Sequence, residues 1–498
     1  MNVNPITRLD YPDPDVIRVE DTYYMVSTTM HFMPGCEILQ SFDLVHWEHV
    51  TYVYETLDHT DAQQLKSGQN IYGQGMWAAS LRYHEGRFYI CFVANDTRKT
   101  YLYTSEKIDG PWKKQLIEGF YHDGSLLFDE DGRSYIVYGN DEIWITELNE
   151  DLTAPKKDGL HRLLVSDHKN PELGYEGSHI QKINGYYYIF LVHSLRDRWM
   201  RTEACFYSDS LEGEFTGGDV LCDDRGYCGQ GVAQGGIVDT PDGKWYAMLF
   251  QDSGAVGRIP ILLPVTWKDH FPIFGQNGHV PEEIEVHSTR PGYIYQPLVG
   301  SDDFCNGLLP RWQFNHDPDP RYYHLDALQG TYTITTREVC TELTQAVNTL
   351  TQRMSYPSCA AEVTVDASAL KEGDVAGLCA LQSCYAAVGI TKHHGKYEVL
   401  MLDKKEDGIL DMTEGTVVES HQMDFRLEAD FCNMKDEARC YYRVNKGDWL
   451  PIGTVHKLYF KLDHFTGCRF GLFCYAAEET GGSACFRDFK YYDVDEIS

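Results

Sequence analysis

The chain has 498 residues, enough for two to four domains of ordinary size. Its 43 Lys and Arg stand against 75 Asp and Glu, which gives a formal net charge of −32. This balance excludes nucleic acid and an anionic membrane surface as expected partners, because both need clustered basic residues. The first residues show neither the basic nor the apolar region of a secretory signal, and the 15 cysteines form no CxxC pair. We therefore expect a cytoplasmic protein without membrane spans, whose cysteines are reduced and buried.

Short aromatic and β-branched runs recur through the first part of the chain, at 23–26, 88–91, 135–138, 187–190 and 245–248. Four of them follow a turn glycine: Gly86, Gly132, Gly185 and Gly243. The first run follows Thr22 instead. An Asp-Gly or Asn-Gly pair between two strand-like runs is a strong hairpin signal, and further strand-like runs lie before and after each hairpin.

The residue nine positions before each turn residue defines a repeat, occupied by Asp13, Trp77, Asp123, Glu176 and Gln234. The repeat positions are 64, 46, 53 and 58 residues apart. Units of this length with three or four short strands are typical of propeller blades. We therefore predict an all-β protein in which residues 1–295 form a five-bladed β-propeller. The repeat position is expected near one mouth of the central channel, once per blade.

Three of the five repeat positions carry carboxylates, and carboxylates that face one cavity force their pKa values apart. Hydrolysis of an acetal needs a proton donor at the leaving oxygen and a base or nucleophile on the opposite face of the sugar. Asp13, Asp123 and Glu176 can meet that need, since a third carboxylate helps to keep the donor protonated. A hard metal cation is the competing use of such a cluster.

These residues and their neighbours resemble glycoside hydrolase family 43. The likeness covers most of residues 5–275 and rests on six segments: 11–15, 21–25, 42–47, 76–80, 123–132 and 176–187. It implies that Asp13 is the general base, that Glu176 is the general acid and that Asp123 adjusts and orients the acid. Because the family inverts the anomeric centre, base and acid are expected about 6.5–9.5 Å apart.

The same resemblance assigns substrate-binding residues. It places Phe32 and Trp77 at the wall of the terminal sugar subsite and Arg258 within reach of the sugar hydroxyls. Many members have a histidine on the channel axis where this chain has Gln234, a departure that argues against an axial metal or histidine contact. We expect no metal and no cofactor. A glutamine there can still form a hydrogen bond with water.

The pattern changes after residue 300, following a segment at 276–299 that suits a linker. Irregular strand-like runs, among them 330–335, 397–402 and 470–475, indicate a β-sandwich over residues 300–498. Segments 302–304, 312–316 and 348–353 resemble the concanavalin-like sandwich attached to many family-43 β-xylosidases. In those enzymes the sandwich packs on the propeller and can lend a loop to the rim of the active site.

The sequence thus predicts an inverting exo-glycosidase that releases terminal xylose or arabinose from β-D-xylosides or α-L-arabinofuranosides of hemicellulose oligosaccharides. An oligosaccharide is the expected partner, and assembly into a homo-oligomer is left open. The main alternative is a propeller that binds sugar without catalysis, which would be expected to lack one or more channel carboxylates. A retaining fructosidase on the same architecture would need a different N-terminal nucleophile motif, which is absent.

Overall fold

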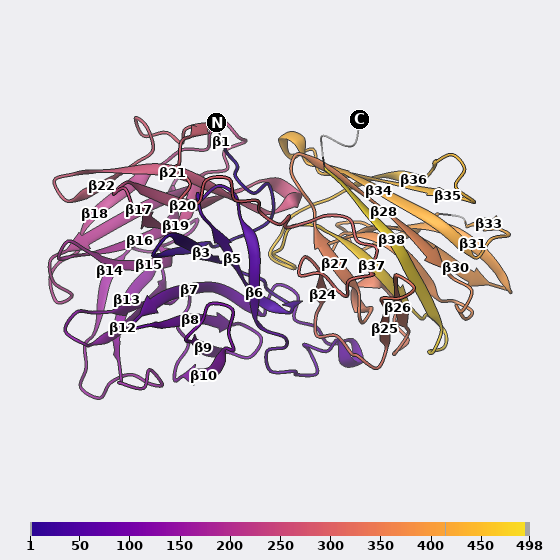
Figure 1. Ribbon diagram of the computed structural model, residues 1–498, viewed down its shortest axis with the longest axis horizontal. Helices are drawn as coiled ribbons and strands as arrows, with labels where there is room; N and C mark the ends of the chain where they lie inside the picture. The colour runs from indigo at the N-terminus through magenta and orange to yellow at the C-terminus, as the bar shows by residue number, and fades with distance from the viewer. Residues whose placement is uncertain (1, 414, 494–498) are drawn as a thin grey trace.

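A computed structural model of the protein describes residues 2–413 and 415–493. Two β-rich domains lie side by side along the longest axis of the molecule (Figure 1). The N-terminal part of the chain, indigo to magenta in the figure, forms five separate four-stranded sheets, and the orange and yellow part forms two larger sheets. This arrangement confirms the predicted all-β class, with a five-bladed propeller followed by a β-sandwich.

Each blade is antiparallel, and the strand that comes first in the chain is the innermost one. The blades consist of β2 (Asp15–Val19), β3 (Thr22–Val26), β5 (Gly35–Ser41) and β6 (Glu48–Tyr54); β7 (Met76–His84), β8 (Arg87–Ala94), β9 (Lys99–Ser105) and β10 (Lys113–Ile117); β11 (Ser125–Phe128), β12 (Ser134–Asn140), β13 (Glu142–Leu148) and β14 (His161–Ser166); β15 (Glu176–Ile183), β16 (Tyr186–Ser194), β17 (Arg201–Ser208) and β18 (Thr216–Leu221); and β19 (Val232–Asp239), β20 (Trp245–Asp252), β21 (Arg258–Lys268) and β22 (Phe271–Phe274). The predicted turn glycines therefore lie between the first two strands of their blades.

Arg82 ties four blades together around the central channel. From β7 it donates to the carboxylate of Asp15 in blade 1 at 2.8 Å, to Ser125 Oγ in blade 3 at 2.7 Å and to the carbonyl oxygen of Ile180 in blade 4 at 3.1 Å. A cavity of about 300 Å³ is lined by the inner strands of all five blades, with Arg82 among its residues. The inner strands thus surround a channel, as the repeat predicts.

The propeller ring closes without exchange of a strand between its first and last blades. An ion pair of Arg18 with Asp239 joins these two blades, and the short strand β1 (Asn2–Val3) pairs with β23 (Glu283–Ile284). After β22, the last strand of the propeller blades, the chain forms β23 and then β24, which belongs to the sandwich. The predicted domain boundaries at 295 and 300 lie in the segment between these strands and stay a prediction.

Two antiparallel sheets form the C-terminal domain. The first has the order β32-β31-β30-β29-β37-β27-β24-β4, with β33 also paired to β31, and the second has the order β25-β26-β38-β28-β34-β35-β36. Their strands are β4 (Phe32–Met33), β24 (Gln313–Asn315), β25 (Tyr323–Asp326), β26 (Thr331–Thr335), β27 (Leu350–Arg353), β28 (Ser358–Asp366), β29 (Val375–Leu381), β30 (Ala386–His393), β31 (Lys396–Lys404), β32 (Leu410–Met412), β33 (Thr416–Val418), β34 (Gln422–Asp430), β35 (Glu437–Arg443), β36 (Leu450–Lys457), β37 (Arg469–Tyr475) and β38 (Ser483–Asp493). The structure also has four short 3₁₀ helices among the described residues: η1 (Lys66–Gly68), η2 (Gly254–Val256), η3 (Leu343–Gln345) and η4 (Cys432–Met434).

The two domains share a core. Strand β4 leaves blade 1 and pairs with β24 at the edge of the sandwich, while Val256 from the propeller is packed within the core of the sandwich. At the same interface, Arg353 forms a buried ion pair with Glu37 at 2.8 Å and lies 4.0 Å from the ring centre of Tyr11. A buried charge that is paired in this way fixes the relative position of its partners, because separating them would leave each charge desolvated.

All 15 cysteines are free thiols, as predicted. The expectation that they are buried holds for most of them, but Cys222, Cys228, Cys305 and Cys432 are exposed. Among the described residues, no helix has both the length and the apolar character that crossing a membrane requires.

Candidate active site

The five predicted repeat positions all lie at the entrance to the inner strands. Trp77, Glu176 and Gln234 are among the first three residues of β7, β15 and β19, whereas Asp13 and Asp123 come two residues before β2 and β11. Asp13, Asp123 and Gln234 have positive φ values of 53°, 48° and 65°, a conformation that costs free energy in a residue with a β-carbon. Backbone strain of this kind is concentrated at functional sites.

The inner strands are also irregular at this end. The register between the first two strands shifts in blade 2 between Met76 and Ala79, in blade 4 between Glu176 and His179, and in blade 5 between Ala233 and Gly236. A bulge of this kind turns a side chain away from its regular direction. The repeat position of each of these blades lies inside the irregular segment.

Asp13 is held through both carboxylate oxygens. Thr28 Oγ1 donates to Oδ2 at 2.6 Å, and Arg258 Nη1 donates to Oδ1 at 3.0 Å. Arg258 is 2% exposed, and its main-chain N–H donates to Asp10 Oδ1 at 2.7 Å. Arg258 was predicted to reach the sugar, and its described ion pair is with Asp13. Its Nε is buried and has no hydrogen-bond partner among the described residues.

Glu176 is contacted by a histidine and an amide. His122 Nε2 lies 3.3 Å from Glu176 Oε2, and Asn140 Nδ2 donates to the same oxygen at 2.7 Å. The side chain of Glu176 is 18% exposed, whereas that of Asp123 is 6% exposed. Glu176 is therefore the more accessible carboxylate of this pair, as a group that meets a substrate must be.

Asp123 lies between these groups. Its Oδ2 accepts a hydrogen bond from the main-chain N–H of Gly177 at 2.9 Å and lies 3.4 Å from His122 Nε2. Burial raises the pKa of Asp123 to about 6; the charges of Glu176 and Asp13 act in the same direction, and that of His122 opposes them. Burial opposes protonation of His122, but the charges of Asp123 and Glu176 outweigh it and raise the pKa of His122 to about 9. The three predicted carboxylates thus share one electrostatic environment.

An aromatic ring from the sandwich completes this region. Phe465 lies with its ring centre 4.2 Å from the guanidinium of Arg258 and 5.7 Å from the ring of Trp77. The Trp77 ring lies 5.9 Å from that of His122, and its buried Nε1 has no hydrogen-bond partner. Trp77 is therefore beside the carboxylates with an unused donor, and Phe465 covers the side that faces the second domain.

The remaining two predicted residues, Gln234 and Phe32, lie in different surroundings. The main-chain N–H of Gln234 donates to the buried Glu203, and its side chain packs against Gly177, next to Glu176. Phe32 is 2% exposed in β4, and its ring is covered by the guanidinium of Arg469 at 3.4 Å and belongs to a core cluster of the sandwich. Gln234 is therefore brought to the site, whereas no described contact joins Phe32 to the carboxylates. Its predicted sugar contact remains a prediction.

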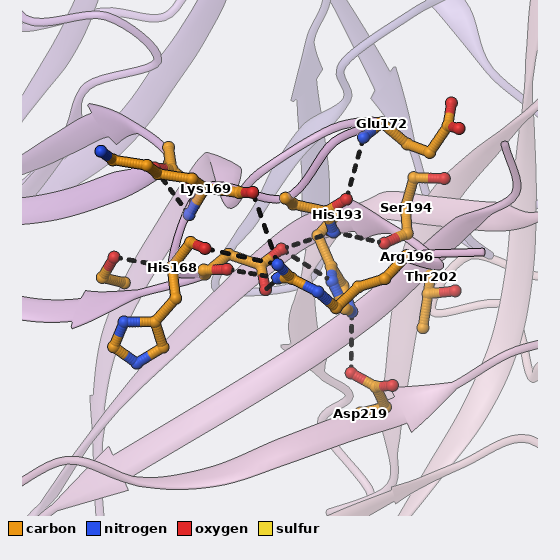
Figure 2. Close-up of polar contacts among 12 residues, drawn as sticks. His168, Lys169, Glu172, His193, Ser194, Arg196, Thr202 and Asp219 are labelled. Atoms are coloured by element: carbon orange, nitrogen blue, oxygen red, sulfur yellow. Dashed lines mark hydrogen bonds and ion pairs between the residues drawn. The ribbon is translucent and has the colours of Figure 1, made fainter. Parts of the chain in front are cut away.

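The segment that leads into β15 is anchored by a polar network (Figure 2). Arg196 donates to the carbonyl oxygens of Asp167, His168 and Lys169, and Figure 2 shows its guanidinium directed at this segment. His193 lies between Asp167 and Asp219, at 3.1 and 2.8 Å, on opposite nitrogens of its ring. Burial opposes protonation of His193, but hydrogen bonds and charges of both carboxylates raise its pKa. Arg196 thereby fixes the backbone of residues 167–169.

Comparison with known proteins assigns the two domains. Residues 3–272 match the model of glycosyl hydrolases family 43, and residues 301–492 match the beta xylosidase C-terminal concanavalin A-like domain. The chain belongs to glycosyl hydrolase family 43. It is a glycosidase, so the alternative of a non-catalytic sugar-binding propeller is not supported.

Several relatives cover nearly the whole chain. A beta-xylosidase of Formosa agariphila is 27% identical over 99% of this chain and 89% of its own length. A non-reducing end alpha-L-arabinofuranosidase of Bacteroides ovatus is 24% identical over 82% of this chain and 79% of its own length. Among solved structures, a bifunctional GH43-CE protein of Bacteroides eggerthii is 42% identical with a TM-score of 0.93. The match covers 100% of this chain and 64% of the Bacteroides eggerthii protein.

Four residues of the site escaped the sequence reasoning: Thr28, His122, Asn140 and Phe465. His122 directly precedes Asp123, and its position beside a repeat carboxylate was an available signal. Thr28 and Asn140 belong to no motif that we recognised, and Phe465 is 452 positions after Asp13 (465 − 13). Only the packing of the sandwich on the propeller brings that ring to the site.

Proposed function

We propose that this glycosidase is an inverting exo-enzyme that removes terminal xylose or arabinose from β-D-xylosides, α-L-arabinofuranosides or both. The observation that carries the proposal is the separate support of two carboxylates in one site. Asp13 is held by Thr28 and Arg258, and Glu176 is held by His122 and Asn140. Two carboxyl groups with different surroundings are what hydrolysis of an acetal with one acid and one base requires.

In the proposed reaction, Asp13 accepts a proton from the attacking water while that water forms the new bond to the anomeric carbon. Glu176 donates its proton to the leaving oxygen as the glycosidic bond breaks. The bonds from Thr28 and Arg258 orient Asp13 toward one position, which reduces the entropy that alignment would otherwise cost. Asp123 is buried beside the acid and is coupled to it by charge, so it is proposed to adjust and orient Glu176.

Restricted access supports action at chain ends. Phe465 from the sandwich lies over Arg258 and beside Trp77, so it covers this side of the carboxylates. Relatives named beta-xylosidase and alpha-L-arabinofuranosidase support both substrate types, which present similar hydroxyl arrays. We further propose a cytoplasmic location, which the free thiols support.

The decisive test compares initial rates on nitrophenyl β-xyloside and nitrophenyl α-arabinofuranoside, with the product anomer followed by proton NMR. Turnover of either compound with inversion is expected. Retention would reject Asp13 as the base, and failure on both compounds would reject the substrate class.

Two variants test the roles of the carboxylates. Glu176→Gln should lower the rate on natural oligosaccharides by about 10²- to 10⁴-fold and spare nitrophenyl glycosides, whose leaving group needs little protonation. Asp13→Asn should fail on both kinds of substrate. Asp219→Asn, which removes a carboxylate bound to His193, is the matched control and should keep normal rates. Equal losses on both substrates for Glu176→Gln would contradict its role as the acid.

A further inference from the structure

His122, Asp123 and Glu176 direct one possible metal-ligand atom each at a common point. His122 Nε2 lies 3.4 Å from Asp123 Oδ2 and 3.3 Å from Glu176 Oε2, and all three atoms lie within 4.8 Å of one another. Among the described residues, this is the one group of three or more His, Cys, Asp or Glu side chains with that geometry.

The two distances from His122 Nε2 match those between ligands of a tetrahedral zinc ion. Bonds from Zn²⁺ to nitrogen and oxygen measure about 2.0–2.1 Å, so neighbouring tetrahedral ligands lie about 3.4 Å apart. Ca²⁺ takes six to eight oxygen ligands, and Mg²⁺ prefers octahedral oxygen donors. One imidazole and two carboxylates therefore favour a later first-row divalent cation.

The ligands are arranged before an ion arrives. The main-chain N–H of Gly177 fixes Asp123 Oδ2, and Asn140 fixes Glu176 Oε2. Asp123 is 5% exposed, whereas Glu176 remains accessible, so an ion can enter from the side of the substrate. Three protein ligands leave the fourth tetrahedral position for water.

We propose that Zn²⁺ or a cation of the same class binds to His122, Asp123 and Glu176 and reversibly inhibits the enzyme. Coordination bonds form, and any proton on the ligand atoms is released to solvent, with no covalent or redox step. The oxygen of Glu176 that the ion takes is then unavailable to carry a proton. Binding stands on the ligand geometry alone, whereas the inhibition rests on the proposed function of Glu176 as the acid.

Co²⁺ serves as the probe of binding in the untagged full chain, after alkylation of the exposed thiols. Titration of the protein should produce a visible absorption spectrum of four-coordinate Co²⁺ that saturates at one equivalent, and Zn²⁺ should displace it. His122→Gln should weaken Co²⁺ binding by at least about tenfold.

His193→Gln is the matched control. His193 also lies between two carboxylates, but they contact opposite ring nitrogens, as the close-up of this histidine with Asp219 illustrates (Figure 2). A single ion is therefore unable to bind His193, Asp167 and Asp219 together. His193→Gln should bind Co²⁺ as the unmodified protein does. Absence of the spectrum, or its persistence at full affinity in His122→Gln, would overturn the site.

Kinetics then test the consequence. Zn²⁺ should inhibit hydrolysis of a natural oligosaccharide, and a chelator should restore that rate. Hydrolysis of a nitrophenyl substrate should be largely spared, because its leaving group needs little protonation. With each rate normalised to that of the same protein without metal, His122→Gln should require at least about tenfold more Zn²⁺ for half inhibition. Stoichiometric Zn²⁺ binding without inhibition of the oligosaccharide reaction would leave the metal site standing and overturn the proposed role of Glu176.

Discussion

Acid should weaken the interface between the two domains through a cluster of buried histidines. His31, His316 and His464 pack around Tyr72, and the rings of His464 and Tyr72 are stacked with centres 3.9 Å apart. His31 and His316 are 0% exposed and His464 is 4% exposed. Burial lowers the pKa of His464 to about 3, although the charge of Asp463 acts in the opposite direction.

The sign of the effect follows from linkage. The unfolded chain binds a proton at a histidine below a pKa of about 6.5, whereas folded His464 stays neutral until about pH 3. The folded state therefore loses stability as the pH falls from about 6.5 to about 3, and below that range the contribution is constant. Between pH 7 and pH 5, this one residue should lower the free energy of unfolding by about 2 kcal/mol.

The other two histidines act in the same direction. Burial lowers the pKa values of His31 and His316 well below the ordinary value, and the nearby histidines add to this effect. For His31 the charge of Arg469 adds further to it. The whole cluster should therefore make the protein more sensitive to acid than His464 alone.

His464→Phe tests this reasoning, because phenylalanine can keep the stacking on Tyr72 but does not titrate. Unfolding in urea at pH 7 and pH 5 should show that the variant loses about 2 kcal/mol less than the unmodified protein over this interval. His324→Phe, at an exposed histidine of β25, is the control and should keep the difference between pH 7 and pH 5 of the unmodified protein. Equal pH dependence in His464→Phe and the unmodified protein would refute the assignment.

Three further predictions concern the channel, the rim and the backbone. Asp15→Asn should lower the free energy of unfolding by about 3–5 kcal/mol, because it removes the buried carboxylate that pairs with Arg82, whose side chain is 13% exposed; a loss below about 1 kcal/mol in urea unfolding would contradict this. Phe465→Ala should raise KM for short substrates about tenfold with a smaller change in kcat, because it removes the ring beside Trp77 and Arg258; unchanged KM in steady-state kinetics would show that the ring does not cover a bound sugar. Gly75→Ala, at φ +80°, would place a β-carbon 2.3 Å from a carbonyl oxygen and should cost about 2–4 kcal/mol, whereas Gly86→Ala, at φ +79° with nothing within 4 Å, should cost about 1 kcal/mol; similar shifts in Tm would argue against the steric contribution.

The architecture was accessible from the sequence because each blade is a local unit. A hairpin such as β7–β8 is specified by alternating strand residues and by Glu85-Gly86, which both take positive φ. Five such units in succession leave few arrangements other than a closed ring. Asp13, Asp123 and Glu176 were found for the same reason, since each occupies the same place in its unit.

Phe32 and the residues that the sequence did not indicate share a different property. Phe32 lies between β3 and β5 of blade 1 in sequence, but its strand pairs with β24 of the sandwich, almost 300 positions later. Asn140 reaches Glu176 from the neighbouring blade, and Phe465 reaches Trp77 from the second domain. Contacts between units carry no periodic signal in a single sequence.

By itself the sequence determined the number of blades, the two-domain order and the three carboxylates, because these depend on hairpins and on a repeat within short stretches of chain. The tertiary structure alone decided the partners of those carboxylates. Arg258 binds Asp13, His122 lies between Asp123 and Glu176, and Phe465 covers the arginine. The physical reason is that burial and charge act through space, so the surroundings of each carboxylate are set by segments that meet only when the ring closes and the sandwich docks.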